Sequence, residues 1–106
     1  MTSGERDTRN EEEIVAESSA PLVGIVLGSK SDLSYAQETE RVLERLGVSC
    51  ETRVLSAHRM PDATMEYARA ARDRGLRVII AMAGLAAHLP GVIASHTTLP
   101  LSLIHI

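Results

Sequence analysis

The stretch that decides the fold is PLVGIVLGSKSD, residues 21–32. Within it, Leu22 to Leu27 is an uninterrupted apolar run that is rich in β-branched residues. Such a run predicts a strand that is buried on both faces. Gly28 ends this strand, and either Ser31 or Asp32 can cap a helix that follows. A buried strand that leads through a short loop into a helix is typical of a parallel α/β sheet.

The chain repeats this alternation of strand and helix twice more, with connections of a few residues. Glycines at the expected helix ends, and a proline at the expected start of the second helix, support the boundaries. The predicted elements are strand 22–27, a helix to about Leu46, strand 48–55, a helix from Pro61 to before Gly75, strand 78–82 and helix 86–95. Three such units predict right-handed crossovers and a parallel sheet that is covered by helices.

Strand 48–55 differs from the other two because polar and apolar residues alternate along it. One set of side chains is Val48, Cys50, Thr52 and Val54, and the opposite set is Ser49, Glu51 and Arg53. This alternation predicts a strand near a sheet edge. The helical period predicts an inner face with Leu33, Ala36, Leu43 and Leu46 on the first helix, and with Tyr67, Ala68 and Ala71 on the second.

The first twenty residues are polar and carry an acidic run at Glu11 to Glu13. They cannot bury enough apolar surface to offset the entropy lost on ordering, so Met1 to Ala20 is predicted to be a flexible leader. A short helix around Glu11 to Glu17 would be marginal on its own. Residues 21–100 are therefore expected to form the folded domain.

Composition points to one soluble cytoplasmic domain. The 106 residues are 44% hydrophobic and 24% charged, and the net charge of −3 gives no reason to expect nucleic acid as a partner. The single cysteine, Cys50, excludes an internal disulfide and fits a reducing compartment. We find neither an apolar run long enough for a membrane span nor a secretory signal, so no membrane partner is expected.

Three loops follow the carboxyl ends of the predicted strands, where open α/β sheets bind their ligands. They are 28–32, 56–59 and 83–91. If the first strand lies between the other two, all three loops share one crevice. We treat that convergence as the main argument for an active site.

The first two loops carry polar groups suited to a phosphorylated sugar. Ser29 adds a hydroxyl beside a helix amino end, and Asp32 can accept bonds from ribose hydroxyls, although capping the helix explains Asp32 equally well. Arg59 offers a fork of donors that suits phosphate, with Ser56 beside it. His58 can exchange a proton near neutral pH, yet a histidine before a helix is also often a surface or capping residue.

The third loop is apolar and nearly uncharged. Ala83, Gly84, Ala86 and Ala87 leave space, while His88 fixes the turn. The loop suits a small ligand without charge, although close packing of a helix on the sheet explains it as simply. Other chemistries have no support in the sequence, because it holds no hydrolase elbow, Walker loop or zinc-ligand cluster.

At these loops the sequence resembles the phosphoribosylaminoimidazole carboxylase family, whose bacterial form is N5-carboxyaminoimidazole ribonucleotide mutase. The matching segments are GSKSD, SAHRMPD and AGLAAHLPG, within a similarity from about Val23 to Pro100. The resemblance implies a flavodoxin-like three-layer α/β/α parallel sheet, with only its first three βα units present. It also implies a cytoplasmic enzyme of purine biosynthesis that assembles as a homo-octamer and uses no cofactor, neither metal nor ATP.

The resemblance also implies roles for individual residues. Ser29, Asp32 and Arg59 would hold the ribose phosphate with help from Ser56, and His58 would be the general acid and base. The carboxylate, or the carbon dioxide that it becomes, would lie against Ala83, Gly84, Ala86 and His88. Direct carboxylation of aminoimidazole ribonucleotide, and a non-catalytic flavodoxin-like phosphate-binding module, remain the alternative functions.

The chain departs from the family pattern near its end. Met82 and Leu85 stand where glycine is common, but neither touches the polar anchors. After Pro100 the family continues with further strands, whereas this chain ends in LSLIHI, the translation of a common sequencing adapter. We therefore predict that 101–106 is an artefactual tail, that the domain is truncated and inactive alone, and that the sheet edge beside strand 78–82 is open.

Overall fold

The computed structural model describes residues 13–17, 20–57, 59–84 and 88–105. They form a five-stranded sheet in the order β1-β3-β2-β4-β5. The strands are β1 (Glu13–Glu17), β2 (Val23–Leu27), β3 (Cys50–Val54), β4 (Val78–Ala83) and β5 (Leu101–His105). The helices are α1 (Leu33–Arg45), α2 (Pro61–Ala71) and α3 (His88–Ala94), with a short 3-10 turn, η2 (Lys30–Asp32), before α1.

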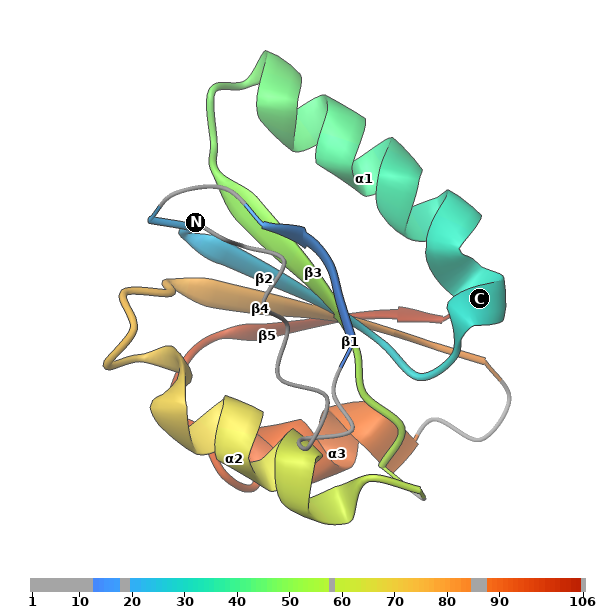
Figure 1. Cartoon of the computed structure of the whole chain (residues 1–106). Helices are drawn as coiled ribbons and strands as arrows, with labels where there is room; N and C mark the ends of the chain where they lie inside the picture. Colours follow the sequence, from blue (N-terminus) through green and yellow to red (C-terminus); the bar gives the residue numbers. More distant parts are fainter. Residues whose placement is uncertain (1–12, 18–19, 58, 85–87, 106) are drawn as a thin grey trace.

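The predicted alternation of strands and helices is confirmed. β2, β3, β4 and β5 are mutually parallel, and only β1 runs against its neighbour β3. Figure 1 shows α1 on one face of the sheet and α2 with α3 on the other. In chain order the parallel strands lie second, first, third and fourth, which is the flavodoxin-like arrangement.

The apolar run of the first strand forms the centre of this three-layer structure. All five residues of β2 are buried, because the strand has neighbours on both edges and helices over both faces. The cluster under α1 contains Val23, Ile25, Leu27, Ala36, Val54 and Met82. The cluster under α2 and α3 contains Val26, Leu55, Tyr67, Ala68, Ala71, Leu76, Ile79, Ala81, Leu89 and Ile93. The predicted inner face of α2 is therefore confirmed, whereas Leu46 at the end of α1 is 69% exposed.

The leader prediction was wrong for Glu13–Glu17, which forms β1 instead of a flexible segment or a helix. This strand pairs antiparallel with β3, with an irregularity between Ile14 and Ala16. Edge pairing uses backbone N–H and C=O groups, so a short segment can join a sheet without an apolar core of its own. Residues 1–12 of the predicted leader lie outside the described residues.

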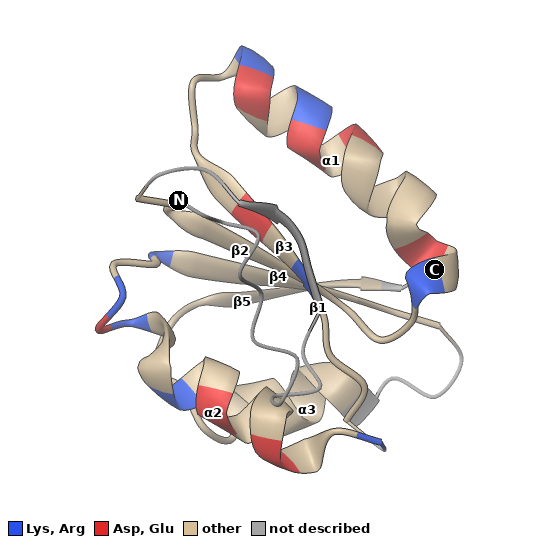
Figure 2. Ribbon diagram, viewed as in Figure 1, with Lys and Arg blue, Asp and Glu red and all other residues tan. Residues whose placement is uncertain are grey.

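The polar side chains that alternate along β3 are buried. Glu51 is completely buried and Arg53 is 9% exposed, because α2 covers that face and supplies polar partners. Figure 2 shows charged residues mainly along α1 and α2, with one acidic and one basic segment inside β3. The prediction of a strand near a sheet edge is confirmed, because only β1 lies outside β3 in the described sheet.

The edge of β4 is covered rather than open. β5 pairs with β4 in parallel register, from Ile79 opposite Leu101 to Ala83 opposite His105. The outermost strand is then β5, where Leu103 is 52% exposed. Within the described ranges, none of the helices combines the length and the apolar character that a membrane crossing requires.

Candidate functional site

The carboxyl ends of the three central strands lie at one level. Leu27 at the end of β2 pairs with Val54 of β3 on one side and with Met82 of β4 on the other. The strand that leads into the first loop is therefore flanked by the strands that lead into the other two. This is the arrangement on which the sequence argument depended, and it is confirmed.

The first loop folds on itself through serine hydroxyls. The Ser29 hydroxyl accepts a hydrogen bond from the Ser31 backbone N–H at 3.2 Å and lies 2.9 Å from the Ser31 hydroxyl. Ser29 thus caps the η2 turn, while both serines stay exposed. Asp32 is the N-cap residue that directly precedes α1, but its side chain makes no capping hydrogen bond. Its carboxylate is therefore not needed to cap the helix, which removes the main structural explanation for that residue.

The second loop is a tight turn built around Ser56. The Ser56 carbonyl accepts a hydrogen bond from Met60 N–H at 2.7 Å, and its hydroxyl accepts one from Arg59 N–H at 3.2 Å. Ser56 is 9% exposed, whereas the side chain of Arg59 is exposed. The turn holds the backbone and leaves the guanidinium in solvent, where it can reach an anion. His58, the predicted acid and base, lies outside the described residues.

The third loop starts from a buried strand end. Ala83 is 6% exposed, and a side chain added at Gly84 would meet no described atom within 4 Å. Among the described residues, none therefore fills the space beside Gly84. Ala86 lies outside the described residues, and His88 is described only as the first residue of α3.

An apolar neighbour of the first loop, from α3, was missed by the sequence analysis. The methyl carbon Cδ2 of Leu89, which is 3% exposed, lies 4.0 Å from the position that a Cβ would take at Gly28. Leu89 therefore forms an apolar wall beside the first loop. The sequence gives little indication of this neighbour, because a leucine that follows a histidine does not reveal which strand end it packs against.

Cys50 lies at the opposite end of β3 from these loops. Burial raises the pKa of its thiol, and the charges of Glu40, Glu44 and Glu51 act in the same direction. A raised pKa reduces the thiolate fraction that a nucleophile needs. The interpretation of Cys50 as a structural strand residue agrees with this environment.

Comparison with known proteins matches this sequence to one family. The sequence model of the AIR carboxylase family matches residues 22–104. The chain is 55% identical over 87 residues to an N5-carboxyaminoimidazole ribonucleotide mutase of Pyrococcus horikoshii, covering 82% of this chain and 49% of that protein. It is also 55% identical over 80 residues to the enzyme of that name from Bacillus subtilis, covering 76% and 49%.

A third relative has a different organisation. A bifunctional purine synthesis protein of Dictyostelium discoideum is 54% identical over 80 residues, which are 76% of this chain and 8% of that protein. The chain spans about half the length of the mutases that it matches. Because the family model covers far more than half of these 106 residues, the chain belongs to the AIR carboxylase family.

Proposed function

We propose that the full-length gene product isomerises N5-carboxyaminoimidazole ribonucleotide to 4-carboxy-5-aminoimidazole ribonucleotide in purine biosynthesis. The observation that carries this proposal is the alignment of three strand ends, which brings polar and small-residue loops to one rim of the sheet. The names of the mutase relatives add the substrate class. We further propose that the enzyme is cytoplasmic and works as a homo-oligomer, an octamer as the family resemblance implies.

The proposed roles follow the chemistry of each loop. Arg59 and the hydroxyls of Ser29 and Ser56 would bind the phosphate, because a guanidinium and neutral donors together match its oxygens. Asp32 would accept hydrogen bonds from the ribose. The small residues Ala83 and Gly84, with Ala86 and His88, would enclose the carboxylate where little water can enter.

The reaction needs one group that moves protons and one pocket that retains a gas. The bond between the exocyclic nitrogen and the carboxylate breaks, carbon dioxide leaves, and the nitrogen receives a proton. The electron-rich ring carbon then attacks carbon dioxide and loses its own proton. We assign both proton transfers to His58, whose imidazole can serve as acid and then as base near neutral pH. A dry pocket keeps carbon dioxide from escaping between the steps.

The first prediction tests His58 in the full-length protein. Replacing His58→Asn should abolish turnover while binding of the nucleotide stays within about threefold, because phosphate and ribose contacts are made by other residues. Turnover is measured by chromatographic separation of the two carboxylated nucleotides, and binding by calorimetry. His96→Asn is the matched control, since this histidine follows the carboxyl end of α3 and its ring contacts the Val92 carbonyl. Loss of binding together with turnover in the His58 variant would contradict the catalytic assignment.

Direct carboxylation is the second candidate within the same family, whose model is named for AIR carboxylase. The two reactions differ in the substrate that they accept. The proposed mutase converts the N5-carboxylated nucleotide without added bicarbonate, whereas a carboxylase requires aminoimidazole ribonucleotide and dissolved carbon dioxide. Supplying each substrate separately to the full-length protein distinguishes them.

A further inference from the structure

A buried network of charged and aromatic groups lies at the end of β3 opposite the candidate site. The side chain of Glu51 is completely buried and receives a hydrogen bond from the Tyr67 hydroxyl at 2.8 Å. Arg74 donates to the same carboxylate through Nη1 at 3.0 Å and Nη2 at 2.5 Å, and Arg53 Nη2 lies 3.4 Å away. A buried carboxylate with this many donors holds its partners in one geometry.

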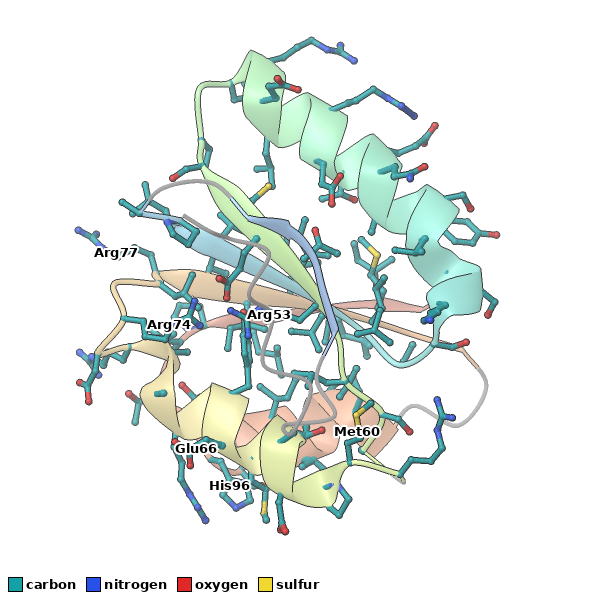
Figure 3. The ribbon with its side chains drawn as sticks, viewed as in Figure 1. Arg53, Met60, Glu66, Arg74, Arg77 and His96 are labelled. Carbon is teal, nitrogen blue, oxygen red and sulfur yellow. The ribbon has the colours of Figure 1, made fainter. Side chains whose placement is uncertain are left out.

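The ring of Tyr67 lies near both guanidinium groups. Arg53 stands 5.5 Å and Arg74 5.7 Å from the ring centre, within the range of cation–π attraction. Figure 3 shows both arginines beside one another in the layer between the sheet and α2. Arg53 comes from β3, Tyr67 from α2 and Arg74 from the turn after α2. The network therefore joins the helix to the sheet.

A glycine in the central strand makes room for this network. Gly24 of β2 pairs directly with Glu51 of β3. A Cβ built on Gly24 would stand 2.1 Å from the Tyr67 hydroxyl oxygen and 3.3 Å from the ring carbon Cζ. No real Cβ tolerates the first of these distances. The phenol thus occupies the space that any other residue at position 24 would fill, and β2, β3 and α2 meet at this point.

The other end of α2 continues into the second loop of the candidate site. The backbone N–H and the hydroxyl of Thr64 both donate to the Met60 carbonyl, at 3.0 and 2.8 Å. Met60 N–H and Arg59 N–H in turn bond to Ser56. Displacement of α2 along β3 would therefore pull on the turn that carries Arg59, because hydrogen bonds couple the helix start to the end of the strand.

We propose that Tyr67 is a positioning residue that fixes α2 on the sheet and so sets the geometry of the Ser56–Arg59 turn. It does so by packing over Gly24 and by its hydrogen bond to Glu51. The consequence for activity rests on the proposed function, but the structural coupling does not. A network that only stabilises the fold would protect all parts of the chain alike. A positioning network protects the distant turn more than other segments of the same stability.

The test uses Tyr67→Phe, Gly24→Ala and the double variant, with Ala36→Gly as a matched control. Ala36 is the buried residue of α1, which packs on the opposite face of the sheet. Replacing it with glycine therefore lowers the stability of the fold without changing a contact of α2. Hydrogen exchange at the Arg59 and Met60 amides is measured by NMR in the 106-residue chain, relative to the slowest-exchanging amides of β2. We expect exchange at both amides to accelerate about tenfold more in Tyr67→Phe than in Ala36→Gly. Equal acceleration in the two variants would overturn the proposal.

The double variant tests the packing of the Tyr67 hydroxyl against Gly24. Phenylalanine at position 67 lacks the oxygen that a Cβ on residue 24 would strike. Gly24→Ala should therefore do less damage in the Tyr67→Phe background than in the native one, which is a non-additive effect. Strictly additive losses of stability would overturn the proposed packing of Tyr67 against Gly24. If Gly24→Ala alone fails to fold, recovery of the fold in the double variant supports that packing.

Enzyme kinetics in the full-length protein then link the network to the site. Tyr67→Phe should raise the KM for the nucleotide by about tenfold, because it should displace the Ser56–Arg59 turn by less than the ~1 Å that can cost about a hundredfold in rate. Ala36→Gly should leave KM unchanged. An unchanged KM in Tyr67→Phe would overturn the proposal. If the native full-length protein shows no mutase turnover, the proposed function fails, and the exchange experiment still decides the positioning role.

Discussion

Tyr67 is held where its ionisation is strongly disfavoured. Burial raises the pKa of its hydroxyl, and the charge of Glu51 and the hydrogen bond to that carboxylate raise it further, against the opposing effect of Arg53 and Arg74. The neutral phenol is thus favoured in the folded chain, whereas the unfolded chain ionises with its usual pKa of about 10. Since the folded pKa is the higher one, the contribution to stability is complete below pH 10 and is lost as the pH rises above it.

This difference predicts alkaline destabilisation that depends on a single residue. Above about pH 10, the free energy of unfolding should fall by up to about 1.4 kcal/mol per pH unit through Tyr67. Tyr67→Phe should remove this slope, and Tyr35→Phe should not, because Tyr35 is 53% exposed. Urea denaturation between pH 9 and pH 11, a range of about one unit on either side of the phenol pKa, gives the comparison. Equal slopes in the two variants would show that Tyr67 does not ionise on unfolding as described.

Single residues also show how far the sequence could predict the site. Ser29, Asp32, Ser56 and Arg59 follow strand ends, and strand ends are readable from apolar runs and from the residues that interrupt them. The role of Glu51 was not readable. Its partners Tyr67 and Arg74 are 16 and 23 residues away in the sequence. A strand whose polar side chains are buried with distant partners therefore has the same alternating sequence pattern as a strand whose polar side chains face water.

Among the elements, β1 lies outside the part of the chain that the family model matches, which is residues 22–104. It pairs with β3, whose outer edge would otherwise present unpaired backbone groups. The connection to β2 is anchored where the Ser49 hydroxyl donates to the Ala20 carbonyl at 2.9 Å. We expect β1 to protect this edge of the sheet from pairing with other chains.

Deletion tests this expectation at the scale of the element. A chain without residues 1–17 should associate at concentrations where the native chain does not, because the edge of β3 becomes available. Sedimentation velocity measures the association. A chain without residues 1–12 keeps β1 and is the matched control, so it should behave like the native chain. Identical sedimentation of all three chains would show that β1 does not protect the edge.

Prediction of elements succeeded where side chains determine the structure and failed where the backbone does. β2 and β4 were identified because buried strands need apolar residues on both faces. β1 was missed because its short apolar stretch, Ile14 to Ala16, lies within a polar leader, and the segment is ordered by main-chain pairing with β3. β5 was missed for a different reason: residues 101–106 were interpreted as an appended tail, although Leu101–His105 pair in register with β4.

At the scale of the whole molecule, the order of the strands decides the function that can be proposed. β2 lies between β3 and β4, with the crossover through α1 on one face of the sheet and the crossover through α2 on the other. The loops that follow the three strands therefore leave from neighbouring carboxyl ends. Alternation alone predicted a parallel sheet but not which strand is central. The central place of β2 is seen only in the structure, because strand 78–82 is apolar as well and its sequence does not distinguish the two positions.

The central claim is that one nucleotide contacts all three loops together. Hydrogen exchange of the full-length protein, measured with and without aminoimidazole ribonucleotide, tests it most directly. We predict slower exchange of backbone amides in 28–32, 56–60 and 83–88, and unchanged exchange in 41–46 at the far end of α1. Protection of only one loop, or protection at the amino ends of the strands, would contradict the account.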